Sequence, residues 1–486
     1  MTISRDTLIA ELHKILPSES VIHQDEGLSP FECDGLSAYR EKPLVVVLPE
    51  SIEHIKSVIA LCKQHLIPIV TRGAGTGLAA GALPLSNGLL LVVSKLKKII
   101  SINPDARSAT LQPGVRNLAI SDAAKPYGLF YAPDPSSQIA CSIGGNVAEN
   151  SGGVHCLKYG LTVNNILQLK ILTIEGELIT LGSEALDTPG YDLLALLTGS
   201  EGLLGVIVEV TVKLIPIPPT VQVLLAAFDD VSKAGDAVSS IIASGFLPAG
   251  LEMMDQLSIR AAEDFIHAGY PEDAKAILLC EVDGSLEECE YLSEQIKHLL
   301  LNKGAITVEV ATDPTHRATL WQGRKSAFPA VGRLSPDYYC MDGTIPKKAL
   351  SFVLTQIQAL STHYGLSVAN VFHAGDGNLH PLILYDANTP GELDKAEQFG
   401  NQILDLCVKV GGTITGEHGV GKEKLDAMCS QFNSDEIIQF KAIKHAFDAK
   451  ELLNPGKAIP TLHRCAELGA MHVHNGELPF PDIPRF

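Results

Sequence analysis

Helical spacing of hydrophobic residues marks two segments near the start of the chain. In residues 1–16, Leu8, Leu12 and Leu16, with Ile9 and Ile15 beside them, fit one face of a helix. A second set at positions 52, 55, 58, 59 and 62 falls on one side of a helix over residues 51–65. Both segments are therefore predicted to be helices that bury one face.

From about residue 43 to residue 216, short runs of aliphatic residues alternate with glycine-rich segments. Such runs, bounded by glycine or proline, are typical of strands. Strands are predicted at 43–49, 65–71, 89–93, 108–112 and 166–173. Residues 215–219 contain three prolines and are predicted to form a stiff linker, because proline cannot donate to a ladder.

Beyond this linker the pattern changes. Strands are predicted at 221–228 and 276–282 and near Ile306, Tyr339 and Val368, with helices at 232–243, 286–301 and 346–363. This order favours an antiparallel sheet with helices on one face, which is an α+β domain.

Length and charge narrow the class of protein. At 486 residues the chain exceeds one hydrophobic core, so two or three domains are expected. A hydrophobic content of 46% with 19% charged residues describes a folded protein. The net charge of −19 argues against nucleic acid or direct binding to an anionic membrane, but not against docking on a partner protein.

The N-terminus and the cysteines point to a cytoplasmic protein. The first residues lack the basic flank and continuous apolar core of a signal peptide, and no run of about 18 apolar residues is present. The ten cysteines include no C-x-x-C pair, which fits reduced thiols and disfavours an iron–sulfur cluster or attached haem.

Two segments rich in small residues, 71–77 and 142–153, suit the binding of a pyrophosphate. Backbone N–H groups approach an anion most closely where side chains are absent. A nicotinamide-binding fingerprint is disfavoured, because Leu78 occupies the position of its third glycine. Residues 416–422 match the spacing of a nucleotide-binding P-loop, but Glu423 replaces the required hydroxyl residue, which argues against an ATPase.

Two histidines flank an Asp-Gly pair in residues 371–380. If Asp376 and Gly377 form a two-residue hairpin turn, His373 faces His380 with Cβ atoms about 4.5–5.5 Å apart, which suits two imidazoles sharing one metal. Glu417 would complete a set of two histidines and one carboxylate, which suits Zn²⁺, Mn²⁺ or Fe²⁺. The alternative is a surface hairpin with two unrelated histidines.

These motifs resemble known flavoproteins over nearly the whole chain. Residues 72–81, 143–153 and 198–207 resemble the FAD-binding domain of the vanillyl-alcohol oxidase-type flavoproteins. The segments 369–381, 415–422 and 453–457 are similar to the FAD-linked 2-hydroxy-acid dehydrogenases. Segments 321–333, 338–346 and 461–474 resemble, in particular, a glycolate-oxidising branch of that family.

The resemblance implies an α+β fold with a two-subdomain FAD-binding domain, an antiparallel-sheet cap, and a C-terminal segment that returns to the flavin. The expected divisions are 1–40, 41–216, 217–410 and 411–486. FAD is expected to be bound non-covalently, although Cys141 and His155 lie near the flavin loops. The residues that the resemblance assigns to FAD are Arg72, Gly73, Ala74, Gly75, Thr76, Gly77, Gly81, Pro133, Asp134, Ser137, Cys141, Gly144, Gly145, Asn150, Gly152, Gly153, Glu201, Gly202, Gly205, Ile207 and Asn454.

The same resemblance implies roles in catalysis. His418 is expected to be the base that takes the hydroxyl proton of a 2-hydroxy acid, or else a hydrogen-bond partner of the metal ligands. Arg324 is expected to grip the substrate carboxylate, with Arg333 as a second candidate; the alternative for either is a solvated surface charge. His373 and His380 are expected to contact substrate as well as metal.

The expected reaction is oxidation of glycolate to glyoxylate, and also of D-lactate to pyruvate. Cys340 stands where hydroxyglutarate-oxidising relatives have a lysine, so a monocarboxylate substrate is favoured. Electrons are expected to leave through a second FAD-type subunit and an iron–sulfur subunit to a quinone, with the complex held at the inner membrane by its partners. A stand-alone D-lactate dehydrogenase and a non-catalytic flavoprotein remain alternatives.

Overall fold

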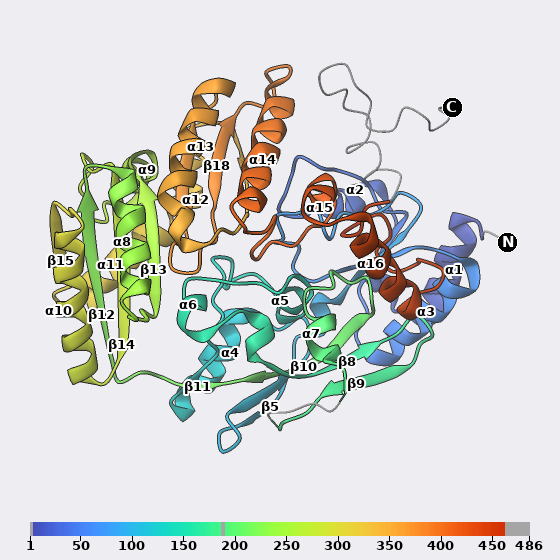
Figure 1. The fold of residues 1–486 in the computed structure, drawn as a ribbon. Coiled ribbons are helices and arrows are strands. Elements are labelled where there is room, and N and C mark those ends of the chain that lie inside the picture. The colour runs from blue at the N-terminus through green and yellow to red at the C-terminus, as the bar shows by residue number, and fades with distance from the viewer. Residues whose placement is uncertain (1–2, 186–189, 462–486) are drawn as a thin grey trace.

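A computed structural model describes residues 3–185 and 190–461 of the protein (Figure 1). The chain begins with a small sheet in the order β1-β2-β4-β3. Strands β2 (Val45–Val47), β4 (Leu89–Val92) and β3 (Ile69–Arg72) are parallel, and β1 (Val21–Ile22) is antiparallel to β2. The predicted helices are α1 (Arg5–Ile15) and α3 (Ile52–His65), and their buried residues share one core with the sheet.

A second, five-stranded sheet is entirely antiparallel and follows the order β5-β6-β10-β8-β9. Its strands are β5 (Ile99–Asn103), β6 (Ser108–Leu111), β10 (Val206–Lys213), β8 (Ile166–Leu172) and β9 (Leu178–Gly182). The short helices of this half are α2 (Asp25–Leu28), α4 (Asn117–Ala124), α5 (Ile143–Glu149), α6 (Cys156–Tyr159) and α7 (Leu193–Leu197).

The third sheet has seven antiparallel strands in the order β15-β12-β14-β13-β17-β18-β16. The strands are β12 (Thr220–Phe228), β13 (Gly250–Asp255), β14 (Ala276–Gly284), β15 (Thr307–Val310), β16 (Asp337–Cys340), β17 (Val368–Phe372) and β18 (Pro381–Tyr385). The predicted antiparallel cap is therefore present, on the left of Figure 1 and extending to its top.

The prediction that helices cover only one face of this sheet is wrong. One face carries α8 (Val231–Ala243), α10 (Leu286–Asn302), α13 (Leu350–Tyr364) and α14 (Glu392–Lys409). The other carries α9 (Gln256–Ile266), α11 (Pro314–Lys325) and α12 (Ala327–Val331). The reason is visible in β12, whose consecutive residues Leu224 and Leu225 are both buried and belong to different cores. A strand that is apolar on both faces requires a cover on both.

The predicted stiff linker is also corrected by the structure. Residues Ile215–Pro216 form β11, which pairs with β7 (Leu129–Phe130). Ile217 donates its N–H to the carbonyl oxygen of Gly128 at 2.9 Å. The prolines remove donors but leave their non-proline neighbours able to pair, so the crossing between the two halves is anchored to the FAD-binding half.

After α14 the chain returns to the first sheet. Helices α15 (Leu425–Gln431) and α16 (Ser434–Phe447) follow, and Figure 1 shows α16 on the same side of the molecule as α1 and α3. Asn454 donates its N–H to the carbonyl oxygen of Ile69 at 2.8 Å, and Ile69 donates to Leu452 at 2.7 Å. The divisions between domains stay predictions, and positions 462–474 of the C-terminal motif lie outside the described residues.

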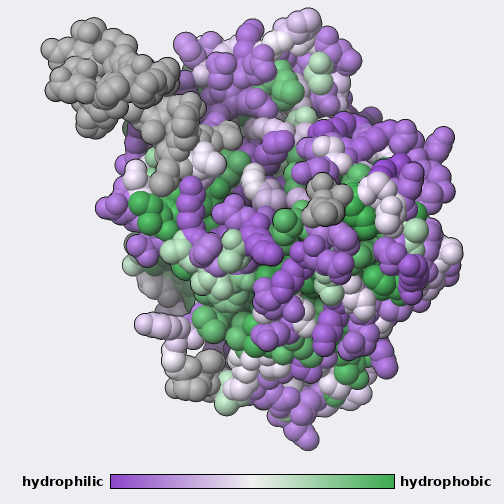
Figure 2. Space-filling view, turned by 90° about the vertical axis from the view of Figure 1, so that its right-hand side faces the viewer, coloured by the Kyte–Doolittle hydropathy of each residue, from purple (hydrophilic) through white to green (hydrophobic). Residues whose placement is uncertain are grey.

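One face of the molecule is mostly polar at its surface, although 46% of the residues in the chain are hydrophobic. On the face that carries α1, α3 and α16, hydrophilic residues predominate and hydrophobic ones are interspersed among them (Figure 2). Within the part of the chain that the structure describes, no helix is long and apolar enough to cross a membrane.

A histidine bridge joins the two halves of the molecule. The ring of His155 contacts Asp134 Oδ2 through Nδ1 at 2.8 Å and Glu281 Oε1, on β14, through Nε2 at 3.0 Å. Burial acts to lower the pKa of His155, but these two carboxylates outweigh it and raise the pKa well above the usual value. The charged ring therefore ties the FAD-binding half to the cap sheet.

We expect this bridge to make stability pH-dependent. The stabilisation is fully present below the usual histidine pKa of about 6.5 and is lost as the pH rises through the higher folded-state pKa. His155→Gln should lower stability at pH 6 by about 1.5–3 kcal/mol, the range for hydrogen bonds to charged groups. Melting temperatures of both proteins at pH 6 and pH 9 check this. A difference that is the same at both pH values would contradict it.

Candidate active site

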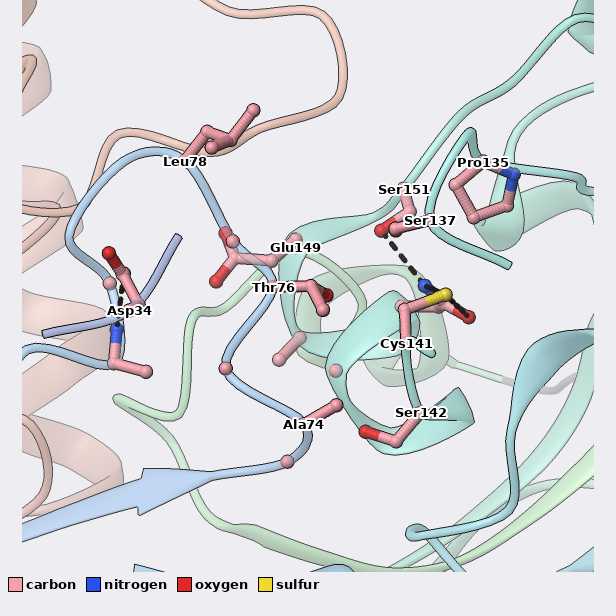
Figure 3. Close-up of a pocket in the computed structure, with 18 of the residues that line it drawn as sticks. Asp34, Ala74, Thr76, Leu78, Pro135, Ser137, Cys141, Ser142, Glu149 and Ser151 are labelled. Atoms are coloured by element: carbon pink, nitrogen blue, oxygen red, sulfur yellow. Dashed lines mark hydrogen bonds between the residues drawn. The ribbon is translucent and has the colours of Figure 1, made fainter. Parts of the chain in front are cut away.

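A cavity of about 450 Å³ lies where the glycine loop after β3 meets the segment leading into α5 (Figure 3). Thr76 and Ala74 border it on one side, and Cys141 and Ser142 on the other. The walls approach so closely that side chains are excluded at key positions. A Cβ atom on Gly73 would lie 2.2 Å from Ser142 Oγ.

The cavity fits a pyrophosphate-bearing cofactor such as FAD. The hydroxyl oxygens of Thr71 and Ser142 are buried and have no hydrogen-bond partner among the described residues, and both residues line the cavity. A buried hydroxyl without a partner costs free energy, so both are suited to hydrogen bond with a ligand. The backbone around Gly73 and Gly75 is left open by the missing side chains.

Most of the residues predicted to contact FAD line this cavity. They are Gly73, Ala74, Gly75, Thr76, Gly77, Gly81, Ser137, Cys141, Gly144, Gly145, Glu201, Gly202, Gly205 and Ile207. The structure thus brings together segments that are more than 130 residues apart in the sequence. Their contacts with FAD itself remain a proposal.

The other predicted FAD residues lie behind the wall and hold it in shape. The guanidinium of Arg72 donates to the carbonyl oxygen of Cys33 and lies against Gly75. The amide of Asn454 donates to the carbonyl oxygens of Gly81 at 3.1 Å and Glu201 at 2.7 Å, so that it ties two lining loops together.

The remaining residues of that set also serve the framework. Asn150 ends α5 in the left-handed conformation, and its side chain accepts from Val163 N. The others are Pro133, Asp134, Gly152 and Gly153. Gly152 contacts Glu417, Gly153 lies against Asp134, and the carbonyl oxygen of Pro133 accepts from Asn117. His155, which we considered near the flavin loops, is not a lining residue, whereas Cys141 is.

Sequence reasoning missed several lining residues, among them Asp34, Glu149, Lys325 and Phe328. Ser142 and Glu149 lie inside the segment already recognised from its glycines, so their position was a usable signal. Lys325 and Phe328 lie in segment 321–333, which carried the resemblance but assigned neither of them a role, and Asp34 lies outside every motif; only the fold brings them to the cavity.

The predicted hairpin pairing of the two histidines is wrong in register. His373 donates its N–H to the carbonyl oxygen of Asn378 and pairs with that residue, so residues 374–377 form a four-residue turn. The strand therefore slips by two positions from the predicted pairing. Because side chains alternate with period two, this slip leaves both histidines on one face. Their ring centroids are 5.1 Å apart.

Glu417 joins these two histidines. Its Oε1 atom lies 3.2 Å from His373 Nε2 and 2.8 Å from His380 Nε2. Its Oε2 atom accepts the N–H of Gly152 at 3.1 Å. Burial acts to raise the pKa of Glu417, but its hydrogen bonds to the two histidines outweigh this and hold the pKa well below the usual value.

The segment around His418 is held by one buried carboxylate. Asp342 accepts the N–H groups of Gly416 at 3.1 Å and of His418 at 2.9 Å, and Lys424 Nζ lies 3.3 Å from the same carboxylate. Glu201, a cavity residue, accepts two further N–H groups from this loop, at Val420 and Gly421, both at 2.7 Å. The loop is therefore fixed from both halves of the molecule.

His418 lies beside His380, with a buried nitrogen in its ring. Its ring stacks on that of His380 with centroids 5.0 Å apart, and its Nδ1 atom is buried without a hydrogen-bond partner. Burial is the main cause that lowers the pKa of His418, to about 4, so the ring is neutral near pH 7. Both His380 and His418 line the cavity, together with Glu417.

The same cluster fits a divalent cation. One donor atom from each of Asp342, His380, Glu417 and His418 lies within 4.8 Å of the others. His373, a predicted ligand, is outside this set but lies 3.2 Å from Glu417 Oε1. Nitrogen and carboxylate donors suit Zn²⁺, Mn²⁺ and Fe²⁺. A set of Cys340, His380 and His418 meets the same distance criterion, so Cys340 also faces the cluster.

The two arginines predicted to bind the substrate carboxylate do not line this cavity. Arg324 is buried, and its Nη2 atom contacts Glu252 Oε2 at 2.6 Å. Arg333 lies over the ring of Phe265 at 5.6 Å and is exposed. Neither lines the cavity, whereas Lys325, next to Arg324, does.

The chain matches two family models and several known proteins. Residues 43–182 match the family described as "FAD binding domain", and residues 217–458 match "FAD linked oxidases, C-terminal domain". Glycolate oxidase subunit GlcD of Escherichia coli (strain K12) is 63% identical over 484 residues, covering 100% of this chain and 97% of that protein. A D-lactate dehydrogenase of Anaerostipes hadrus is 31% identical, covering 93% and 96%.

Solved structures confirm the predicted fold. A substrate-bound p-cresol methylhydroxylase superimposes with a TM-score of 0.79 at 16% identity, covering 94% of this chain and 97% of that chain. This is the vanillyl-alcohol oxidase type of FAD-binding architecture. The glycine-lined cavity, both family models and the full-length identity agree: the chain belongs to the family of FAD-linked oxidases that includes glycolate oxidase subunit GlcD.

Proposed function

We propose that this protein oxidises glycolate to glyoxylate as the FAD-bearing catalytic subunit of a multi-subunit dehydrogenase. The observation that carries the proposal is the neutral, unpartnered ring of His418 on the wall of the FAD cavity, beside the cluster of His373, His380 and Glu417. The 63% identity to a glycolate oxidase subunit supports the substrate.

In this proposal His418 accepts the hydroxyl proton of the substrate at Nδ1, the buried nitrogen that has no other partner. A ring with a pKa of about 4 is unprotonated near neutral pH and is ready to accept. Bound FAD supplies the acceptor for the hydride from the substrate carbon. The stacked ring of His380 and the buried Asp342 keep the base in place while the proton moves.

A divalent cation held by His373, His380 and Glu417 would polarise the substrate hydroxyl and make its proton easier to remove. The convergence of both imidazoles on Glu417 Oε1 supports that ligand set. Cys340 faces the same cluster and offers no positive charge, which favours a substrate with a single carboxylate. Arg324 stays the proposed partner of that carboxylate, and Lys325 is a second cation at the cavity wall.

The electrons must then leave the chain. Eight of the described cysteines are free thiols spread through the fold: Cys33, Cys62, Cys141, Cys156, Cys280, Cys289, Cys340 and Cys407. We propose that a second FAD-type subunit and an iron–sulfur subunit receive the electrons and pass them to a quinone. These partners would also hold the protein at the inner membrane.

Anaerobic addition of glycolate to the FAD-loaded protein tests the proposal. Loss of the oxidised flavin absorbance within seconds is the expected result, because the proposed base and cofactor lie on one chain. Bleaching by D-lactate but not by glycolate would assign the protein to the D-lactate dehydrogenases, to which it is also related. No bleaching by either, in protein with FAD and metal bound, would contradict both functions.

A further inference from the structure

Glu252 is a buried carboxylate that the proposed reaction does not use. It lies on β13, and the pairing of Met253 with Phe372 on β17 places it across from His373. Its side chain is 1% exposed. An isolated charge at such a position would be strongly unfavourable, so Glu252 requires polar partners.

The two oxygens of Glu252 contact different groups. Oε1 lies 2.8 Å from His373 Nδ1, and Oε2 lies 2.6 Å from Arg324 Nη2 on α11. Arg324 is 1% exposed and His373 is 4% exposed. Because Arg324 occupies one oxygen, the other is held toward the imidazole. The carboxylate therefore has one fixed orientation between helix and strand.

The other ring nitrogen of His373 faces the proposed metal site. Its Nε2 atom is 3.2 Å from Glu417 Oε1, which also contacts His380. An imidazole whose Nδ1–H is donated to a carboxylate presents the Nε2 lone pair to a metal, in a fixed ring plane and with greater basicity. Glu252 is the group that would impose this arrangement.

We propose that Glu252 is a positioning residue of the metal site: it accepts the hydrogen bond that His373 Nδ1–H donates and thereby aims Nε2 at the cation. This rests on the metal in the proposed function. Glu252 does not line the cavity, so it acts through His373 and does not touch the substrate. Its pairing with Arg324 also links the metal site to the proposed carboxylate-binding residue.

Glu281 offers a matched control. It is a buried glutamate on the neighbouring strand β14, and it also contacts an imidazole, that of His155 at 3.0 Å. It accepts the indole N–H of Trp321 at 2.6 Å and has no contact with the metal cluster. Glu281→Gln removes a comparable buried charge without altering the support of His373.

The test measures the Zn²⁺ dissociation constant of the FAD-loaded protein by competition with a chromophoric chelator. Glu252→Gln should weaken binding by about 10- to 100-fold, the usual effect of losing a carboxylate behind a ligating histidine. Glu281→Gln should change it less than twofold. In a His373→Asn background, Glu252→Gln should add no further loss, because the effect passes through that ring.

Three results would overturn the inference: unchanged affinity in Glu252→Gln, an equal loss in Glu281→Gln, or a full additional loss in the His373→Asn background. None of these three results would contradict the proposed metal site, provided that the wild-type protein binds Zn²⁺. A wild-type protein that binds no Zn²⁺ overturns the metal and the inference together. If Glu252→Gln fails to retain FAD, Glu252→Asp takes its place; it keeps the charge but withdraws the oxygen from Nδ1, and weaker Zn²⁺ binding is expected.

Discussion

Replacing His418 by asparagine is expected to slow the reduction of bound FAD by glycolate by about 10²- to 10⁴-fold, the range attributed to a general base. The neutral ring with its unpartnered Nδ1 is the proton acceptor in the proposed reaction. Asparagine has a similar size and polarity but cannot take the proton. Stopped-flow measurement of anaerobic flavin bleaching gives the rate directly.

The matched control for this variant is His267→Asn. His267 caps α9 in the left-handed conformation, which asparagine tolerates, and it does not line the cavity. This control should reduce its flavin at the wild-type rate. FAD content should be normal in both variants. A His418→Asn protein that still bleaches within a factor of two of the wild type would rule out the base role.

Replacing Glu417 by glutamine is expected to abolish binding of the divalent cation. The loss should exceed the roughly 10- to 100-fold that is typical of residues that only orient a ligand, because Glu417 is itself a proposed ligand. It should also destabilise the protein, since two buried imidazoles lose their shared carboxylate. Breaking a buried ion pair costs about 3–5 kcal/mol. Bound Zn²⁺ and the melting temperature are the two measurements.

Glu423→Gln serves as the control in the same loop. Burial is the main cause that raises the pKa of Glu423, to about 7, against the opposing effect of Lys424, whose Nζ atom lies 3.8 Å from Glu423 Oε2. The amide therefore replaces a group that is largely neutral at pH 6. We expect normal metal binding and a small change in melting temperature at that pH. Equal metal loss in both variants would mean that Glu417 has no special role.

Local features of the chain were predicted well because they depend on neighbours in sequence. The apolar spacing of residues 51–65 corresponds to α3, which begins after the capping residue Ser51. The glycine segments were recognised from the absence of side chains, and the structure places both at one cavity. The predicted pairing of His373 was wrong by two positions, because the same sequence is compatible with a turn of two or of four residues.

Long-range placement decided what local pattern left open. No spacing in the sequence connects Glu252 with Arg324 and His373, because their contacts depend on strand order and on a helix crossing the sheet. The same applies to the residues around Arg324, whose ion pair with Glu252 no local pattern predicted. The cover on the second face of the cap sheet also depended on that order.

The sequence by itself determined the FAD-linked family, the glycine-rich lining of the cofactor cavity and the presence of histidines and a glutamate suited to a base and a metal site. These follow from residue identity and short-range spacing, which the chain carries whatever its fold. Only the tertiary structure decided which groups share a proton or a charge: Glu417 with two imidazoles, Asp342 with the loop of His418, and Glu252 with Arg324. Charge and hydrogen-bond energies depend on distance and burial, and both are set by how distant segments pack.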